Sequence, residues 1–202
     1  MSADPPEHDL LVLAGGGGSR LGGVDKASLQ VAGRRLLERV LEAGATSRRT
    51  VVVGAVRVPA GVMRTLEDPP GGGPVAGIAA GLAALTHDAP APWTVVIAVD
   101  QPEAAMAVDE LLTGAGRAGA EVDLLCPHDE TGHPQWLLAA YRTSALRAAL
   151  EPLGSGHGTS VRRLVAGLRA VEVRSAHVGD IDTWTDHRAW EQRLSPPGGD
   201  GV

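Results

Sequence analysis

Several residue types that often build a protein core or a functional site are scarce in this chain. Its 202 residues include no phenylalanine, one tyrosine and four tryptophans. The core must therefore be built mainly from Val, Leu, Ile and Ala, whose side chains suit helices that lie closely on a sheet. The single cysteine, Cys126, excludes an internal disulfide and a cysteine-based zinc site. We expect Cys126 to be a core strand residue.

Positive charge and long apolar runs are also lacking. Lys and Arg number 18 against 24 Asp and Glu, which gives a net charge of −6 at pH 7. This balance argues against a general nucleic-acid binder, whose affinity rests on clustered positive charge. No apolar stretch approaches the roughly 18 residues of a membrane span. Residues 1–9 lack the basic-then-apolar pattern of a secretory leader, so a cytoplasmic location is expected.

The length and composition predict one globular domain. Hydrophobic residues make up 44% and charged residues 21% of the chain, which is typical of a folded protein. We expect a flexible N-terminus over residues 1–8, a single domain over residues 9–194, and a disordered tail over residues 195–202, where Pro, Gly and Asp prevail.

Short apolar runs alternate with segments of helical periodicity. Strands are predicted over residues 9–14, 50–53, 62–66, 93–99, 123–126, 136–141 and 170–174. Helices are predicted over residues 34–43, 74–85, 104–118, 143–150, 159–168 and 183–193. The alternation predicts a layered α/β domain with a largely parallel sheet. Only about ten residues separate the runs 123–126 and 136–141, too few for a helical crossover, so one of these strands is predicted to be antiparallel.

A glycine-rich loop follows the first predicted strand. Six glycines lie between Gly15 and Gly23, and Arg20 and Lys26 add positive charge. Glycine lets backbone N–H groups turn toward an anion without a Cβ in the way, so the loop is predicted to bind phosphate. It is not a P-loop, because Asp25 and not Gly precedes Lys26, and its glycines miss the spacing of the dinucleotide fingerprint. A plain flexible turn is the alternative.

The same loop, residues 13–26 (LAGGGGSRLGGVDK), resembles the nucleotide signature of the molybdenum cofactor guanylyltransferases, a branch of the nucleotidyltransferase superfamily. Four further segments resemble motifs of that family, in the family's order: residues 67–78 (EDPPGGGPVAGI), 96–102 (VIAVDQP), 132–138 (GHPQWLL) and 180–183 (DIDT). Together the segments cover nearly the whole chain. The resemblance implies a three-layer, Rossmann-like nucleotidyltransferase fold with a mostly parallel, mixed central sheet.

The resemblance also implies roles for particular residues. The residues implied to bind the nucleotide are Leu13, Ala14, Gly15, Gly16, Gly17, Lys26, Asp68 and Asp100. Lys26 would contact the nucleotide phosphates, Arg20 the leaving pyrophosphate, and Asp100 a Mg²⁺ ion. Asp182 would complete the metal site.

Physical arguments leave an alternative open for each carboxylate, and for Asp68 it is a solvated surface residue of a loop. Asp100 ends the clearest predicted strand, where ligands bind in open α/β sheets, and the alternative is that it caps the helix that follows. Asp180 and Asp182 face the same side of an extended segment, and both could instead cap the helix that begins near Thr183. The family usually continues this motif with Pro and acidic residues, whereas residues 184–186 here are Trp, Thr and Asp.

Three other positions carry open interpretations. Gly54 stands where the family often has Asn that helps bind the nucleoside, so either the backbone substitutes or base recognition differs. His133 could face the acceptor or be a loop residue. Trp136 could belong to the core or stack on a pterin.

The activity implied by the resemblance is transfer of GMP from GTP to the phosphate of molybdenum-molybdopterin, with release of pyrophosphate. Its partners would be Mg²⁺, GTP, molybdenum-molybdopterin, and proteins that deliver or accept the molybdenum cofactor. Three alternatives stay open: a cytidylyltransferase for the same pterin, a nucleotidyltransferase for another phosphorylated acceptor, and a catalytically weakened adaptor that binds nucleotide or molybdopterin.

Overall fold

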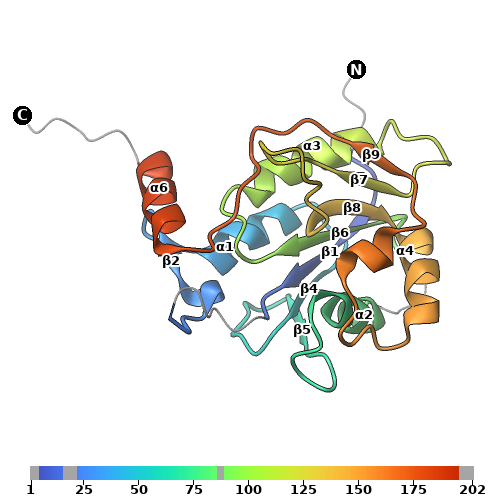
Figure 1. Cartoon of the computed structure of the whole chain (residues 1–202), viewed down its shortest axis with the longest axis horizontal. Helices are drawn as coiled ribbons and strands as arrows, with labels where there is room; N and C mark the ends of the chain where they lie inside the picture. Colours follow the sequence, from blue (N-terminus) through green and yellow to red (C-terminus); the bar gives the residue numbers. More distant parts are fainter. Residues whose placement is uncertain (1–4, 16–21, 86–88, 196–202) are drawn as a thin grey trace, which may run out of the picture.

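A seven-stranded sheet forms the centre of the protein. The computed structural model describes residues 5–15, 22–85 and 89–195. The strands lie in the order β5-β4-β1-β6-β8-β7-β9 (Figure 1). Their bounds are β1 His8–Leu13, β4 Thr50–Val53, β5 Met63–Thr65, β6 Trp93–Ala98, β7 Leu124–Cys126, β8 Leu138–Arg142 and β9 Ala170–Glu172. Every residue of β1 is buried, and from Leu10 to Leu13 the strand is a continuous apolar run.

One strand runs against the others. β8 pairs antiparallel with both β6 and β7, and all other neighbours in the sheet pair in parallel. The short connection from β7 to β8 contains no helix, so the chain returns beside β7 in the opposite direction. The prediction of a mixed, mostly parallel sheet is confirmed.

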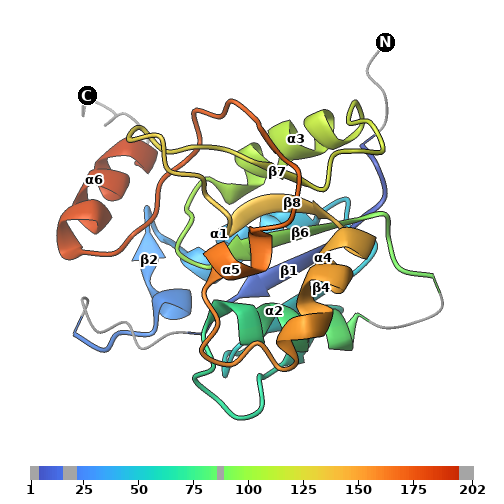
Figure 2. The same ribbon diagram turned by 45° about the vertical axis from the view of Figure 1, so that its right-hand side comes forward.

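Helices cover both faces of the sheet, giving three layers (Figures 1 and 2). On one face, α1 (Leu36–Leu41) and α3 (Ala104–Ala115) bury apolar residues against β1, β4 and β6. On the other face lie α2 (Pro74–Ala84), α4 (Thr143–Leu150) and α5 (Val161–Val165). Short 3₁₀ turns occur at η2 (Lys26–Ser28), η3 (Glu42–Gly44) and η4 (Glu151–Leu153).

Helix α2 approaches the sheet unusually closely, because it presents glycines to it. A Cβ at Gly81 would lie 2.5 Å from the Cδ1 atom of Leu11, and one at Gly77 would lie 2.9 Å from the Cδ2 atom of Leu13. Both distances are shorter than a Cβ contact allows, so a larger residue at either position would force the leucine side chain opposite it to move. The start of α2 is thereby held beside the carboxyl end of β1.

A small unit extends beyond the sheet. Helix α6 (Trp184–Leu194) packs against the hairpin formed by β2 (Gln30–Val31) and β3 (Arg34–Arg35). A separate apolar cluster joins them, made of Leu29, Val31, Leu36, Ile181 and Trp190. The sequence did not predict this hairpin, since strands of two residues carry no readable alternation.

The remaining expectations fall close to the observed elements. The helix predicted over 104–118 ends at Ala115, and the one predicted over 159–168 is confined to Val161–Val165. β1 already includes His8, which is 1% exposed, so the first strand begins one residue before the predicted range. Residues 1–4 and 196–202 lie outside the described residues, and the division into flexible ends and one domain stays a prediction. Within the described ranges, no helix is long and apolar enough to cross a membrane.

Candidate active site

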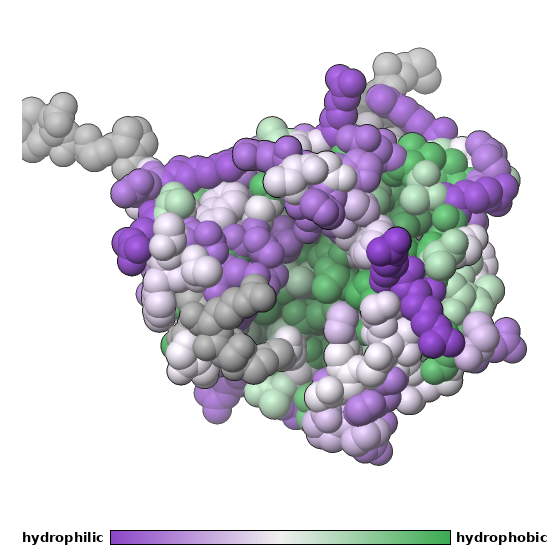
Figure 3. Space-filling view, viewed as in Figure 1, coloured by the Kyte–Doolittle hydropathy of each residue, from purple (hydrophilic) through white to green (hydrophobic). Residues whose placement is uncertain are grey.

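A cavity of 590 Å³ opens where the parallel strands β1, β4 and β6 end. Backbone hydrogen bonds keep these ends together: Ala14 N–H donates to Val53 O over 2.8 Å, and Val99 N–H donates to Leu13 O over 3.0 Å. Figure 3 shows the hollow with an apolar floor and hydrophilic residues around it. This is the edge at which open α/β sheets bind their ligands.

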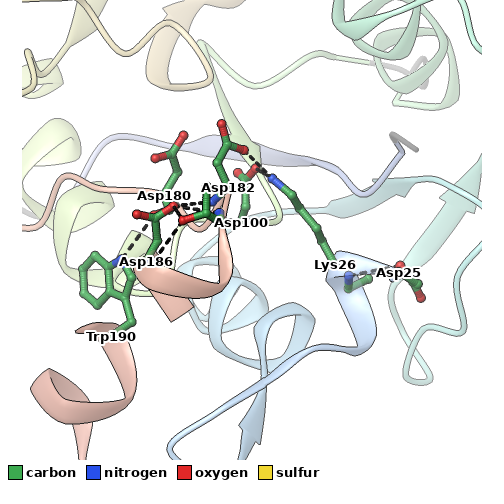
Figure 4. A network of polar contacts seen from close by, with 9 residues as sticks. Asp25, Lys26, Asp100, Asp180, Asp182, Asp186 and Trp190 are labelled. Carbon is green, nitrogen blue, oxygen red and sulfur yellow. Dashed lines mark hydrogen bonds and ion pairs between the residues drawn. The ribbon is translucent and has the colours of Figure 1, made fainter. Parts of the chain in front are cut away.

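Three carboxylates converge at one end of this cavity. Asp100 directly follows β6, and Asp180 and Asp182 lie in the segment before α6. The N–H of Ile181, between the two, donates to the backbone oxygen of Asp100 over 3.0 Å, and the Ile181 side chain is fully buried. One oxygen of each carboxylate lies within 4.8 Å of the others. The extended segment thus presents both of its carboxylates toward Asp100 (Figure 4).

Lys26 reaches into this acidic cluster from the end of the glycine loop. Its Nζ atom lies 2.7 Å from Asp100 Oδ2 and 2.7 Å from Asp182 Oδ1. Burial alone would lower the pKa of the ammonium, but the hydrogen bonds to the two carboxylates raise it above its ordinary value. Lys26 is therefore fully charged at neutral pH. Asp25 fixes the backbone just before it, by accepting from Ala27 N–H (3.1 Å) and Ser28 Oγ (2.7 Å).

The capping role considered for these carboxylates belongs to other residues. At α6, Thr183 is the N-cap and Asp186 completes a capping box with it. The Asp186 carboxylate accepts from the Thr183 hydroxyl and from the N–H groups of Thr183 and Asp182, and the Thr183 hydroxyl bond is the main cause of its lowered pKa. At α3 the N-cap is Glu103, not Asp100. Asp100 and Asp182 are left facing Lys26.

The acidic cluster has the chemistry of a divalent-cation site. Carboxylate oxygens are the ligands that Mg²⁺ prefers. Desolvation, and then the negative charges of Asp100 and Asp182, raise the pKa of the Asp180 carboxyl above its ordinary value of 3.8. Three carboxylates this close together repel one another unless positive charge balances them, and Lys26 supplies one positive charge. The residues fit a Mg²⁺ ion, and the set includes Asp180 beside Asp182, which the sequence analysis had preferred for the metal site.

The raised pKa of Asp180 predicts a small stability effect with a defined pH dependence. A carboxyl whose pKa is higher in the folded than in the unfolded chain opposes folding at neutral pH, and this penalty is relieved as the pH falls through the raised pKa toward 3.8. Asp180→Asn is therefore expected to unfold at a slightly higher temperature than the wild type at pH 7, with little difference at pH 3.5. Because Asp180 is exposed, the gain is small. Calorimetric unfolding at both pH values measures it, and a variant that is less stable at pH 7 would show that the cluster is not strained.

The structure places most of the predicted site residues around the cavity. Leu13, Ala14 and Gly15 line it, together with Lys26, Asp100 and Asp182. Gly16, Gly17 and Arg20 lie outside the described residues, so their predicted roles remain predictions.

Asp68 is placed differently from the prediction. It is exposed, and it is not among the described residues that line the cavity. Its neighbour Glu67 lines the cavity instead and accepts a hydrogen bond from Gly71 N–H over 3.2 Å. The predicted strand 62–66 ends one residue early, at Thr65, and Leu66 is exposed. Glu67 was not identified from the sequence as a site residue, although Glu67 directly precedes Asp68, which was predicted to bind the nucleotide.

Gly54 brings two strand ends into close contact. A Cβ at this position would lie 2.6 Å from the backbone oxygen of Ala14, so an asparagine would not fit without movement of β1 or β4. The Gly54 N–H donates to Thr65 O over 3.0 Å. Val53, one residue earlier, lines the cavity. Where the family often has an asparagine side chain, this protein therefore has close packing between the backbones of Gly54 and Ala14.

Residues of the β7–β8 connection lie to one side of the cavity. His133 is exposed, and its Nδ1 atom lies 2.7 Å from the Thr131 hydroxyl within a turn. Trp136 is half-buried and lines a second hollow of 430 Å³, and its backbone oxygen accepts from the Tyr141 hydroxyl. Cys126 is buried in β7, and burial raises the pKa of its thiol to about 11, so the prediction of a core strand residue is confirmed.

Known proteins are similar to this chain in sequence and in fold. The family model described as the MobA-like NTP transferase domain matches residues 10–173. A molybdenum cofactor guanylyltransferase of Acidiphilium cryptum (strain JF-5) is 32% identical over 181 residues, which cover 84% of this chain and 86% of that protein. One of Rhodopseudomonas palustris (strain BisB5) is 37% identical over 107 residues, 50% of this chain. That match spans about half the length of the Rhodopseudomonas protein, 51%.

A solved structure agrees with these relatives. The molybdopterin-guanine dinucleotide biosynthesis protein A of Archaeoglobus fulgidus superposes with a TM-score of 0.69 at 25% identity, covering 92% of this chain and 97% of that one. The fold and the family define a nucleotidyltransferase. The chain belongs to the family of the MobA-like NTP transferase domain, and the resemblance stated from its motifs is confirmed.

Proposed function

We propose that this protein transfers GMP from GTP to the phosphate of molybdenum-molybdopterin and releases pyrophosphate. One observation carries the proposal: Lys26 lies between Asp100 and Asp182 at the edge of a 590 Å³ cavity. The cavity is walled by the strand end before the glycine loop and by the first turn of α2. The relatives named molybdenum cofactor guanylyltransferase indicate the nucleotide and the acceptor.

The reaction joins two negatively charged phosphates. The attacking oxygen belongs to a phosphate that is already ionised at pH 7, so no general base and no covalent intermediate are required. What the protein must supply is positive charge and alignment at the phosphate where transfer occurs. The Lys26 ammonium, backbone N–H groups at Gly15, and the positive end of the α2 dipole would provide these.

We propose Mg²⁺ as the cofactor, held by Asp100 and Asp182 with Asp180 as a third carboxylate. When bound, it would supply further positive charge to the phosphate oxygens. Lys26 can turn from the carboxylates to a nucleotide phosphate, because both partners accept the same kind of charge-assisted hydrogen bond.

We propose that Glu67, which lines the cavity, selects the base. A carboxylate can accept from both the ring N–H and the amino group of guanine, and cytosine offers no such pair. We expect calorimetry with Mg²⁺ to show tighter binding of GTP than of CTP or ATP. Glu67→Gln should weaken GTP binding by about 10–100-fold, as loss of a hydrogen bond to a charged group does, and should change CTP binding little.

Asp68→Asn is the matched control, since Asp68 is the exposed neighbour of Glu67. It should leave GTP binding unchanged, and a loss in this variant alone would assign the base to Asp68. Preference for CTP would favour the cytidylyltransferase. Binding of none of the three nucleotides would favour the adaptor.

The proposed function includes a cellular location and partner proteins. We propose that the protein acts in the cytoplasm and exchanges its pterin with proteins that deliver or accept the molybdenum cofactor. Its net charge of −6 agrees with the absence of a nucleic acid among these partners.

A further inference from the structure

The segment that carries Asp180 and Asp182 is a C-terminal arm, defined here as residues 176–194. The chain leaves β9 at one side of the molecule and crosses to α6 at the opposite side (Figure 1). The arm belongs to neither helical layer. It holds two carboxylates beside the like charge of Asp100, and contacts away from the cluster can add to the ion pairs of Lys26 in offsetting that repulsion.

A buried carboxylate meets the arm at two separate points. Glu103 stands at the N-cap of α3, three residues after Asp100, and its side chain is 8% exposed. Its Oε2 atom lies 3.2 Å from His177 Nδ1 and 2.5 Å from Arg193 Nη2. His177 precedes Asp180, and Arg193 lies in the last turn of α6. One side chain of the central domain therefore binds both the start and the end of the arm.

The contacts continue from Glu103 to the acidic cluster. Arg193 lies over the ring of Trp190, with its guanidinium carbon 4.7 Å from the ring centroid, and it also donates to the backbone oxygen of Ala176. The Trp190 indole N–H donates to the backbone oxygen of Asp180 over 3.2 Å (Figure 4). The chain of contacts thus runs from Glu103 through Arg193 and Trp190 to Asp180.

We propose that Glu103 is a positioning residue, which binds His177 and Arg193 and so holds Asp180 and Asp182 beside Asp100. This inference deepens the proposed function, because it concerns the geometry of the same cation site. Glu103 does not touch the cavity itself. Residues that orient ligands from outside the first set of contacts commonly change metal affinity by 10–100-fold.

The test is a graded series at this position. Glu103→Met keeps the size of the side chain and removes both hydrogen bonds, and Glu103→Gln keeps an acceptor without the charge. Amide hydrogen exchange within residues 177–194 should be about tenfold faster in Glu103→Met than in the wild type. Glu103→Gln should lie between the two. Exchange in β1 and β6 should be unchanged in both variants.

A second readout is binding of Mn²⁺, used as the probe without nucleotide. Its affinity should fall about tenfold in Glu103→Met and less in Glu103→Gln. Asp109→Asn is the matched control, because Asp109 is an exposed carboxylate on the same helix α3. It should change neither exchange nor affinity. If Glu103→Met unfolds, Arg193→Gln tests the same contact from the half-exposed side and should loosen the arm similarly.

The outcomes separate this inference from the proposed function. Unchanged exchange in the arm, or equal Mn²⁺ affinity in wild type and Glu103→Met, overturns the role of Glu103. Neither readout uses GTP or the pterin. A protein that showed the predicted loosening but bound no GTP would lose the proposed function and keep the positioning role.

Discussion

Asp100→Asn is expected to lower the rate of nucleotidyl transfer by about 10²–10³-fold and to leave the fold intact. Loss of one preorganised charged group at a developing charge has effects of this size. The variant keeps the Asp100 backbone oxygen that accepts from Ile181 N–H, and its amide oxygen can still accept from Lys26. Only the negative charge is removed, so the free energy of unfolding should change little.

Release of pyrophosphate from GTP in the presence of the acceptor measures the rate, and thermal unfolding measures the fold. Mn²⁺ affinity without nucleotide should fall together with the rate, because Asp100 belongs to the cation site and also binds Lys26. Asp109→Asn removes the same charge from an exposed position and should be as active as the wild type. Wild-type turnover in Asp100→Asn would remove Asp100 from the reaction.

Lys26→Met is expected to slow nucleotidyl transfer while it tightens binding of a divalent cation. The ammonium lies 2.7 Å from a carboxylate oxygen on either side, so it competes with any other cation for them. Removing it should tighten binding of Mn²⁺ in the absence of nucleotide. The transfer rate should nevertheless fall by about 10²–10³-fold, since a positive charge aimed at the nucleotide phosphates is lost.

Lys26→Arg is the informative companion of this variant. It keeps the positive charge but replaces a compact ammonium with a longer planar fork, which cannot lie between the two carboxylates in the same way. It should recover little activity and should not show the tighter cation binding of Lys26→Met. If Lys26→Met binds Mn²⁺ more weakly than the wild type, Lys26 supports the cation site and does not compete for it.

The fold could be predicted because its signals are local. Buried strands such as β1 and β6 are continuous apolar runs, and Pro74 marks the start of α2 at the predicted residue. The length of one connection predicted that either β7 or β8 is antiparallel, and the structure shows that it is β8. The hairpin β2–β3 escaped prediction, because its turn at Ala32 and Gly33 has positive φ at both residues and the usual Asn-Gly signal is missing.

The candidate site could be predicted only in part, because tertiary contacts decide it. The position of Asp100 at a strand end is readable from the apolar run before it. Whether Asp182 caps α6 or belongs to the site cannot be read from the sequence, since it depends on Asp186 completing the cap. Glu67 and Asp68 differ by one residue, and the exposed Leu66 extended the apparent strand by one residue. Neighbouring side chains in an extended segment point to opposite sides, so placing the end of a strand one residue too late reverses which residues are expected to be buried.

The most direct test of this account is the product of the reaction itself. The purified protein would be incubated with Mg²⁺, GTP and molybdenum-molybdopterin, and the pterin product and pyrophosphate would be measured together, with CTP in a parallel reaction. We predict a guanine dinucleotide of the pterin and an equal amount of pyrophosphate, with little product from CTP. Binding of GTP without formation of either product would contradict the account and identify an adaptor.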